Sequence, residues 1–347
     1  MTILHIAASL DTGGAERQLY LLCRQTQGRV ENRVTAIARG GRWAEPLRET
    51  GAAVEILGCG MRDPRAIARL AVAIRRSGAD AVHCWLPSVN LVGALVAGGR
   101  PVIASIRNVD DWKPWYYRLA EDLVSPLWSA VVANSHAGAA EAVRQGIQPD
   151  KLRVVPNGIE PRTPLTRLRR SKTTICAVSR LVAQKRVDRI VGLARELPEA
   201  VFLVAGDGPQ RADLAAAAGP NVTFLGEQED PAWLFASADF FVQTSVREGT
   251  SNSLLEAMQA GCVPVVTAAG DNERIVAHGV SGWVGPVEGM ADAITALGPR
   301  WEALSEAAQN AVRGYSVEAM AARTIEIYRK VIQHAPGNAN PIPGLHQ

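Results

Sequence analysis

Two acidic residues bracket the segment Glu248-Gly-Thr-Ser-Asn-Ser-Leu-Leu-Glu256. Glu248 falls in a loop after a predicted strand at 240–243, where its carboxylate could accept hydrogen bonds from the vicinal hydroxyls of a sugar. Glu256 could hold a second diol, such as a ribose. Ser253 and Glu256 also form a capping box, which explains Glu256 without a ligand but leaves Glu248 unexplained. Between the two acids lie residues that would offer free backbone N–H groups to an anion at the start of a helix: Gly249, Thr250, Ser251 and Asn252.

Two basic residues, Arg180 and Lys185, follow a predicted strand at 175–179. At the carboxyl end of a strand, an arginine fork and a lysine point charge can grip a diphosphate and neutralise the charge that grows on a leaving group. The alternative is a solvated basic loop, because Arg186 and Arg189 are nearby in the sequence.

Two glycines, Gly13 and Gly14, open the first predicted helix in the segment Thr12-Gly-Gly-Ala-Glu16. They would let the backbone approach a ligand closely, and the helix start would offer N–H groups to an anion. The segment is not G-x-G-x-x-G, so the dinucleotide fingerprint is absent. A tight strand-to-helix turn without a ligand is the alternative.

Polar side chains also stand where predicted strands of the first half end. His83 lies in the strand Ala81–Cys84, and Arg107 and Asn108 follow the strand Val102–Ile106. Ligands of parallel sheets bind at the carboxyl ends of the strands, so these residues could reach one. A hydrogen-bonded core histidine and an ordinary polar loop are the respective alternatives.

Aromatic residues concentrate between Asp110 and Trp128, which includes three of the eight tryptophans and two of the five tyrosines. Such residues suit an acceptor pocket or a helix at a membrane surface. The sequence favours a third interpretation, the packing of one helix face in the core.

Short β-branched segments alternate with helical periodicity along nearly the whole chain. One series of predicted strands covers the first half: 3–8, 34–38, 54–57, 81–84, 102–106 and 131–134. A second series covers the second half: 175–179, 201–205, 222–225, 240–243 and 263–267. Apolar strands that alternate with helices are typical of parallel sheets covered on both sides.

The predicted fold class is therefore α/β, with two doubly wound, Rossmann-like domains facing each other across a cleft. A proline-rich and then basic stretch from Pro156 to Lys172 is predicted to link them. The first domain takes residues 1–162 and a helix at about 316–334 that we expect to cross back to it; the second takes residues 163–315. Residues 335–347 are predicted to be a flexible tail.

Composition limits the classes of protein that need consideration. The 347 residues are 47% apolar and 20% charged, as in globular proteins. A net charge of +3 is too small to favour nucleic acid binding. Five scattered cysteines without a C-x-x-C pair argue against a disulfide scaffold or a zinc ribbon and fit a reducing cytosol. No secretory signal or membrane-spanning segment is predicted.

The segment Glu248–Glu256, with Gly261-Cys-Val-Pro-Val-Val after it, resembles the Glu-x₇-Glu signature of the retaining glycosyltransferases of family 4, which have the GT-B fold. The resemblance extends over nearly the whole chain, because further short motifs follow in family order. They are Gly13-Gly-Ala-Glu, Asn134-Ser, Pro156-Asn-Gly-Ile, Ser179-Arg-Leu with Lys185, Gly206-Asp-Gly-Pro, and residues 270–282.

This resemblance implies transfer of a sugar from a nucleotide diphosphate sugar with retention at the anomeric carbon. Glu248 resembles the ligand of the donor sugar hydroxyls, Glu256 the ribose ligand, and Arg180 with Lys185 the diphosphate pair. It implies backbone contacts to the donor at Gly13, Gly14, Gly208 and Gly226, and at Gly249, Thr250, Ser251 and Asn252.

The resemblance also bears on the first domain, which it makes the acceptor side. Many family members have a histidine near the reacting sugar at the position of His83 or at that of Trp85, so His83 is predicted to be catalytic. Trp85, Arg107 and Asn108 are predicted to contact the acceptor. The sequence contains no Asp-x-Asp, in agreement with a family that works without a metal.

We therefore expect a cytoplasmic glycosyltransferase of polysaccharide, lipopolysaccharide or lipid-linked glycan synthesis, with no cofactor beyond the donor and no metal. Its expected partners are a nucleotide diphosphate sugar and a glycan or lipid-linked acceptor, and peripheral contact with the inner membrane face is left open. The alternatives are a GT-B-type nucleotide-sugar epimerase and a non-catalytic sugar-nucleotide-binding partner. An NAD-dependent dehydrogenase is disfavoured by the missing glycine fingerprint.

Overall fold

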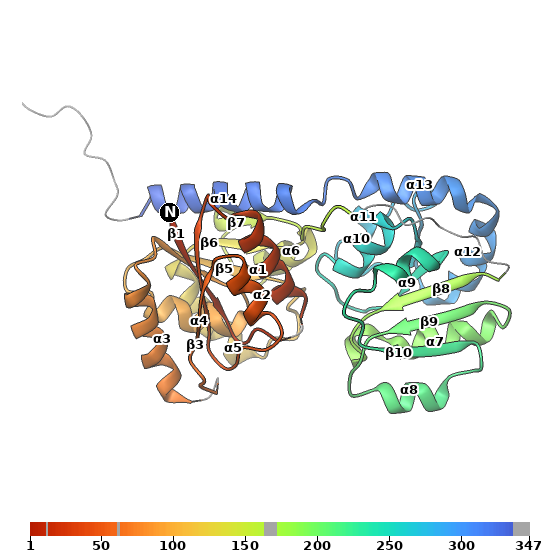
Figure 1. Cartoon of the computed structure of the whole chain (residues 1–347), viewed down its shortest axis with the longest axis horizontal. Helices are drawn as coiled ribbons and strands as arrows, with labels where there is room; N and C mark the ends of the chain where they lie inside the picture. The colour runs from red at the N-terminus through yellow and green to blue at the C-terminus, as the bar shows by residue number, and fades with distance from the viewer. Residues whose placement is uncertain (12, 61–62, 163–171, 336–347) are drawn as a thin grey trace, which may run out of the picture. The chain divides into compact units, whose positions relative to one another are not determined.

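The computed structural model describes residues 1–11, 13–60, 63–162 and 172–335. They form two units, one built from residues 1–158 and α14 (Val317–Gln333) and the other from residues 159–316 (Figure 1). Most of the predicted linker and nearly all of the predicted tail lie outside the described residues.

The N-terminal segment of the first unit ends at Gly158, four residues before the predicted boundary at 162. Gln18 of α1 (Gly14–Gln25) fixes Gly158 to this unit with two hydrogen bonds. Gln18 Nε2 donates to the Gly158 carbonyl at 2.9 Å, and the Gly158 N–H donates to Gln18 Oε1 at 3.0 Å. Ile159 instead pairs with Ser316 and is buried in the core of the second unit. Gly158 is thus bonded to the first unit and Ile159 to the second, which places the boundary between these two residues.

The first unit contains a seven-stranded, fully parallel sheet in the order β3-β2-β1-β4-β5-β6-β7. The order reverses between β1 and β4, as in doubly wound folds. Its strands are β1 (Thr2–Ala7), β2 (Glu31–Ala36), β3 (Ala53–Ile56), β4 (Ala81–Cys84), β5 (Val102–Ile106), β6 (Trp128–Ala133) and β7 (Leu152–Val154).

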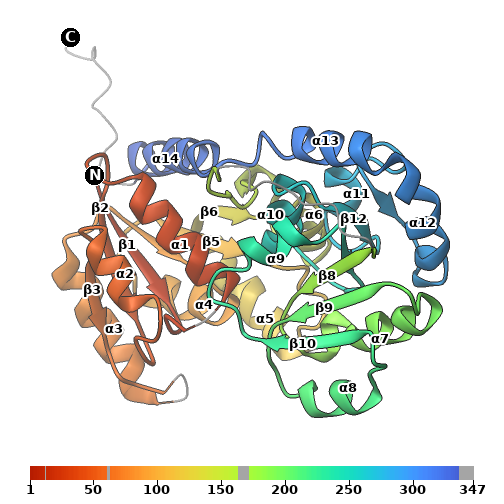
Figure 2. The same ribbon diagram turned by 45° about the vertical axis from the view of Figure 1, so that its right-hand side comes forward.

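Helices cover both faces of this sheet, which explains why its strands are apolar on both sides. One core cluster joins it to α1, α2 (Ala44–Glu49) and α14; the other joins it to α3 (Pro64–Ser77), α4 (Pro87–Val96) and α6 (His136–Arg144). α14 packs along α1, and Figure 2 shows the two helices on the same side of the unit. The predicted return of the C-terminal helix is therefore observed, and Tyr328 anchors it as a fully buried side chain.

The second unit contains six parallel strands in the order β10-β9-β8-β11-β12-β13, with the reversal between β8 and β11. They are β8 (Thr174–Val178), β9 (Val201–Ala205), β10 (Val222–Gly226), β11 (Phe240–Gln243), β12 (Val263–Val266) and β13 (Trp283–Val284). The helices are α7 (Val187–Glu196), α8 (Arg211–Ala217), α9 (Ala232–Ser237), α10 (Asn252–Gln259), α11 (Asn272–Ile275), α12 (Met290–Leu297) and α13 (Trp301–Ala311).

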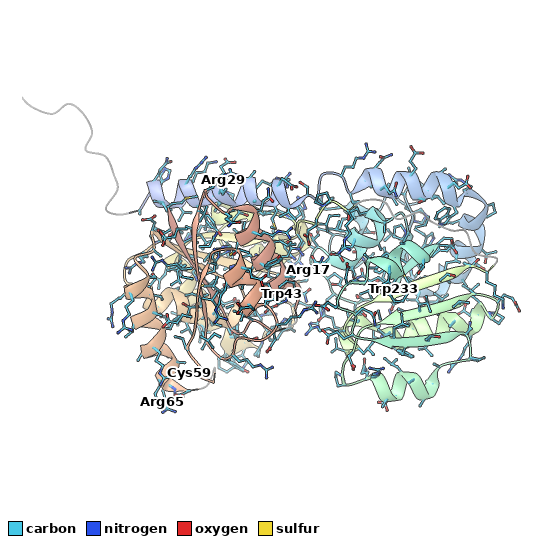
Figure 3. The ribbon with its side chains drawn as sticks, in the orientation of Figure 1. Arg17, Arg29, Trp43, Cys59, Arg65 and Trp233 are labelled. Carbon is cyan, nitrogen blue, oxygen red and sulfur yellow. The ribbon has the colours of Figure 1, made fainter. Side chains whose placement is uncertain are left out.

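Side chains fill the space between each sheet and its helices (Figure 3). In the first unit, Trp43 packs on Tyr20 with the ring centres 5.1 Å apart. All five cysteines, including Cys59, are buried free thiols, so no disulfide supports either core. Hydrophobic packing therefore supplies the stability of both units.

The aromatic segment between Asp110 and Trp128 is helical over only part of its length. α5 covers Trp115–Val124, the turn η1 follows at Ser125–Leu127, and Trp128 begins β6. Trp128 is buried, whereas Trp112 and Trp115 are 54% and 76% exposed. The predicted packing of the aromatic residues in the core is therefore wrong for the outer face of α5.

Candidate active site

An ion pair joins the two main candidates of the second unit. Lys185, in the turn η3 (Ala183–Lys185) after β8, donates a hydrogen bond from Nζ to Oε1 of Glu248, in the loop after β11, at 2.5 Å. The two side chains are 17% and 8% exposed. β8 and β11 are the neighbours at which the strand order reverses, which is where doubly wound sheets bind ligands.

Hydrogen bonds hold the two loops of this pair together. Gln184 donates from Nε2 to the carbonyl of Arg247 at 2.8 Å, and its own carbonyl accepts from Val246 N–H at 3.0 Å. Thr244 Oγ1 lies 3.2 Å and 2.8 Å from the carbonyls of Lys185 and Arg186. Sequence reasoning did not find Gln184 or Thr244, because a polar residue in a loop gives no sign of its partner.

Arg186 is the only residue other than glycine with a positive φ, 49°, among those the structure describes. This left-handed conformation costs roughly 1–2 kcal/mol in a residue with a side chain. It turns the chain from η3 into α7 directly after Lys185, so the surrounding contacts maintain strain beside the site, as functional sites often do.

The loop of Glu248 is also supported by the segment that follows β12. Gly270 has a φ of +61°, and a Cβ there would collide with the carbonyl oxygens of Glu248 and Gly249. Asn272 donates from Nδ2 to Oε1 of Gln243 at 3.0 Å, and Gln243 donates to Ser251 Oγ at 2.9 Å. This buried chain of amides fixes the start of α10 behind Glu248.

Ser251, and not Ser253, is the N-cap of α10, because its Oγ accepts the N–H of Leu254. The predicted capping box of Ser253 and Glu256 is therefore wrong: α10 begins at Asn252 and Glu256 lies beyond its first turn. The Glu256 side chain is 6% exposed. The pKa of Arg162 is raised by a hydrogen bond to Asp230 and further by the charge of Glu256.

The other donor-binding candidates lie in the same unit. Gly249 and Thr250 are buried, and Asn252 is half-buried. A Cβ at Gly208 would collide with the carbonyl of Leu181, so the loop after β9 packs tightly beside that of Arg180. Arg180 itself is exposed, and its side chain makes no hydrogen bond or ion pair with the described part of the chain.

Gly226 ends β10 with a φ of +73°, and the guanidinium of Arg211 lies 3.3 Å from where its Cβ would be. Arg211 is held there by an ion pair with Asp207 at 2.7 Å. The carbonyl of Gly226 accepts the N–H of Gly206 at 2.7 Å. The glycine loops after β9 and β10 are thus joined directly.

Gly13 and Gly14 form the start of α1 in the first unit. Gly13 is the N-cap without a side-chain cap, and the Glu16 carboxylate occupies the position that a Cβ of Gly13 would take. A side chain at position 13 would therefore require the Glu16 carboxylate to move from the start of the helix.

His83 lies in the interior of the first unit, contrary to the expectation that its side chain reaches a ligand. It is 1% exposed, with Nδ1 2.7 Å from Tyr328 Oη and Nε2 2.8 Å from Ser105 Oγ. Burial lowers its pKa well below the ordinary value, and the charge of Arg107 adds to this. β4 directs this side chain at α14, so His83 is a neutral, hydrogen-bonded core residue.

Trp85 belongs to the same interior network and is 2% exposed. Its Nε1–H donates to His5 Nδ1 at 3.1 Å, so His5 carries its proton on Nε2 and donates to Asn32 Oδ1 at 3.0 Å. Burial lowers the pKa of His5 to about 4. The Trp85 ring is therefore not accessible to an acceptor, whereas the sequence predicted that it contacts one.

Arg107 lies over the ring of Trp85, with its guanidinium carbon 4.1 Å from the ring centre. Its Nε is buried and has no hydrogen-bond partner, and burial lowers its pKa to about 10. The negative charge of Glu16 acts in the opposite direction and raises this pKa, so Arg107 keeps its positive charge and is suited to an anion. Asn108 instead uses its side chain locally, accepting the N–H of Val109 at 2.9 Å.

Two sequence models of glycosyltransferase domains match the chain. The model described as "Glycosyltransferase Family 4" matches residues 12–163, and the one described as "Glycosyl transferases group 1" matches residues 172–298. The chain belongs to the family 4 glycosyltransferases. The predicted family is thereby confirmed.

Curated relatives agree with this family. A human phosphatidylinositol N-acetylglucosaminyltransferase subunit is 28% identical over 208 residues, which are 54% of this chain and 43% of that protein. The GDP-mannose-dependent alpha-mannosyltransferase of Mycobacterium tuberculosis is 29% identical over 213 residues, 59% of this chain and 54% of that protein. The chain spans about half the length of these relatives.

The GT-B fold is confirmed by solved structures. Anabaena Alr3699/HepE in complex with UDP-glucose matches with a TM-score of 0.84 at 21% identity, over 95% of this chain and 100% of that one. A glycosyltransferase from Rickettsia africae matches with a TM-score of 0.81 at 17% identity, over 96% and 99%.

Two kinds of feature are absent from the part of the chain that the structure describes. No group of three or more His, Cys, Asp or Glu side chains is arranged to hold a metal ion. No helix has both the length and the apolar character to cross a bilayer.

Proposed function

We propose that the chain transfers a sugar from a nucleotide diphosphate sugar to a glycan or lipid-linked acceptor, with retention at the anomeric carbon and without a metal. The observation that carries this proposal is the Lys185–Glu248 ion pair at the switch point of the second unit. A cation and an anion held 2.5 Å apart offer the two kinds of group that a sugar diphosphate needs.

Donor binding would exchange partners within this pair. Lys185 Nζ turns from Glu248 to the diphosphate, and the Glu248 carboxylate accepts hydrogen bonds from donor-sugar hydroxyls. Arg180, which is exposed and has no competing ion pair among the described residues, adds a second positive charge. Because the pair is largely screened from water, each new charged hydrogen bond is worth more than one at the surface.

The remaining donor contacts follow the loops around the pair. We assign Glu256 to the ribose, since the capping role that competed with this assignment is absent. The backbone at Gly208, Gly226, Gly249, Thr250, Ser251 and Asn252 is assigned to the rest of the donor.

Arg107 is assigned to an anionic group of the acceptor, because its Nε is buried and has no hydrogen-bond partner among the described residues. A buried polar nitrogen without a partner costs free energy, and an anion that accepts a hydrogen bond from it would remove that cost.

In the transfer step, the bond from the anomeric carbon to the phosphate oxygen breaks and a bond to the acceptor oxygen forms on the same face. The acceptor proton passes to the departing phosphate oxygen. Lys185 and Arg180 stabilise the charge that develops there, which is the part a metal would otherwise play. Retention and metal independence are taken from the family resemblance.

The names of relatives and neighbours support the substrate classes. One relative is named for GDP-mannose and another for phosphatidylinositol, and the Anabaena protein was crystallised with UDP-glucose. We extend to this chain a nucleotide-activated hexose and a lipid-linked or glycan acceptor. The five free thiols support a reducing, cytoplasmic location.

The test is a turnover assay with UDP-, GDP- and ADP-hexoses against a panel of lipid-linked and soluble glycan acceptors, with and without EDTA. We expect one donor to give a product whose anomeric proton coupling, measured by NMR, matches that of the donor, with EDTA causing no loss. Inversion, loss with EDTA, or epimerised donor without transfer would each contradict a named part of the proposal.

A further inference from the structure

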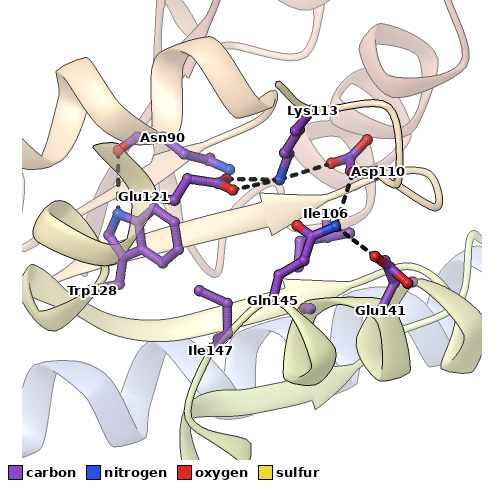
Figure 4. A pocket seen from close by; sticks show the side chains of 11 residues that line it. Asn90, Ile106, Asp110, Lys113, Glu121, Trp128, Glu141, Gln145 and Ile147 are labelled. Atoms are coloured by element: carbon purple, nitrogen blue, oxygen red, sulfur yellow. Dashed lines mark hydrogen bonds and ion pairs between the residues drawn. The ribbon is translucent and has the colours of Figure 1, made fainter. Parts of the chain in front are cut away.

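The segment from Asp110 to Leu127 buries three of its charged side chains and exposes most of its large apolar ones. Lys113 is 4% exposed and donates from Nζ to both carboxylate oxygens of Glu121 at 2.7 and 2.8 Å, with Asp110 3.5 Å away (Figure 4). Gln145 donates to the carbonyl of Asp110 at 3.0 Å beside this cluster. Burial raises the pKa of both Asp110 and Glu121.

The opposite face of α5 is apolar and open. We call this the α5 face; its side chains are between 51% and 76% exposed and are Trp115, Tyr116, Leu119, Leu123 and Leu127. The four within α5 are spaced so that they lie on one side of a helix of 3.6 residues per turn. Tyr117, Glu121 and Val124 point to the interior side.

This arrangement is the reverse of that in a water-facing helix, where apolar residues are buried and charges are solvated. Burying Lys113, Glu121 and Asp110 costs desolvation, while the exposed leucines and aromatic rings gain nothing from water. Such an inversion is favourable when the outer face meets an apolar medium.

Charge beside the α5 face does not favour a charged partner. Arg118 and Asp122 flank the face on α5, Asp111 precedes it, and Lys151 donates from Nζ to the carbonyls of Ser125 and Pro126 in η1. Their charges cancel. Binding at this surface would therefore depend on apolar area and respond little to salt.

The area also argues against a second copy of the chain. Five side chains at these exposures present on the order of 600 Å², below the roughly 800 Å² that each partner of a stable complex covers. Tryptophan and tyrosine at one end of a leucine stripe are, by contrast, the residues that favour the boundary between lipid headgroups and acyl chains.

We propose that the α5 face docks the first unit onto the surface of a lipid bilayer, without preference for anionic lipid. This deepens the proposed function, because a lipid-linked acceptor would be presented at that surface. The contact itself is inferred from the first unit alone and does not depend on the donor site.

The experiment is co-sedimentation of the full chain with phosphatidylcholine vesicles at low and high salt. The variant W115S/L123S removes two outward side chains, and the control I67S/V72S removes two exposed apolar side chains of α3, 49% and 37% exposed. We expect the affinity of the wild type and of the control for the vesicles to change by less than about twofold between low and high salt. The affinity of W115S/L123S should be lower than that of the wild type by roughly tenfold or more.

Three outcomes would overturn the proposal: wild-type chain that stays in the supernatant, equal loss in the control, or a vesicle-free dimer that W115S/L123S dissociates. Thermal unfolding with nucleoside diphosphates separates an effect on vesicle binding from an effect on the donor site. An unchanged ligand-induced shift in W115S/L123S shows that its fold and donor site are intact. Vesicle binding without any nucleotide shift in the wild type would support the docking surface and contradict the proposed function.

Discussion

Glu248→Gln keeps the shape of the side chain at the centre of the site and removes its charge. In the free protein, Lys185 Nζ loses the carboxylate 2.5 Å away and, being 17% exposed, regains little water. Leaving such a charge unpaired costs about 1–3 kcal/mol. A unit of this size loses roughly 2–4 °C of Tm per kcal/mol. The variant should therefore be folded and melt a few degrees lower.

The same substitution should have opposite effects on diphosphate binding and on transfer. A nucleoside diphosphate no longer competes with Glu248 for Lys185, so its affinity should rise about three- to tenfold. Transfer should fall, because charged hydrogen bonds to two sugar hydroxyls are worth about 1.5–3 kcal/mol each. The loss of kcat/KM is then on the order of 10²–10⁴-fold.

Calorimetric titration with the nucleoside diphosphate and initial rates of transfer measure the two effects separately. Glu199→Gln, an exposed acid of the same unit, is the matched control and should leave both unchanged. Transfer near the wild-type rate in Glu248→Gln, or diphosphate affinity that does not rise, would refute the exchange of partners at Lys185.

Three further predictions concern the supports of the site and the interior of the first unit. His83→Phe should cost about 1–3 kcal/mol of unfolding free energy, because Tyr328 and Ser105 lose a buried partner. It should leave kcat/KM within about threefold, and a loss of 10²-fold or more would instead support the predicted catalytic role of His83. The pKa of His5 is lowered by burial from 6.5 to about 4, so the unfolded chain takes up its proton first as the pH falls. Stability should be full above pH 6.5 and fall toward pH 4 by about 3 kcal/mol from His5 alone; urea unfolding that gives a flat profile would contradict this. Gly270→Ala should lower kcat/KM at least about tenfold by displacing the Glu248 loop, whereas the nucleoside diphosphate, which has no sugar hydroxyls, should bind as to the wild type. Wild-type kinetics in this variant would exclude the close approach of Gly270 to that loop.

Much of the fold follows from local sequence. β4, β5, β9 and β11 begin and end where the apolar segments do, because central parallel strands are buried on both faces. β7 and β13, with three and two residues, were not predicted, since edge strands this short have no pattern. The boundary at Gly158 depends on the partner of Gln18, 140 residues away, which no local pattern reveals.

The candidate site could be predicted in part for the same reason. Glu248 and Lys185 follow strands that the sequence locates, so their meeting at a switch point follows from strand order. His83 misled the prediction because a strand end does not reveal which face α14 will cover. The inversion of α5 could not be foreseen either, since only the long-range packing of Lys113 against Glu121 decides which side of the helix faces inward.

The central claim is that Lys185 and Glu248 form the donor site, and binding tests it without knowledge of the acceptor. Wild type and Lys185→Ala should be titrated with a panel of nucleoside diphosphates and their hexoses. We predict that at least one nucleotide hexose binds the wild type and that Lys185→Ala weakens it about 30-fold or more, equivalent to roughly 2 kcal/mol or more. Equal affinity in the two proteins would contradict the account.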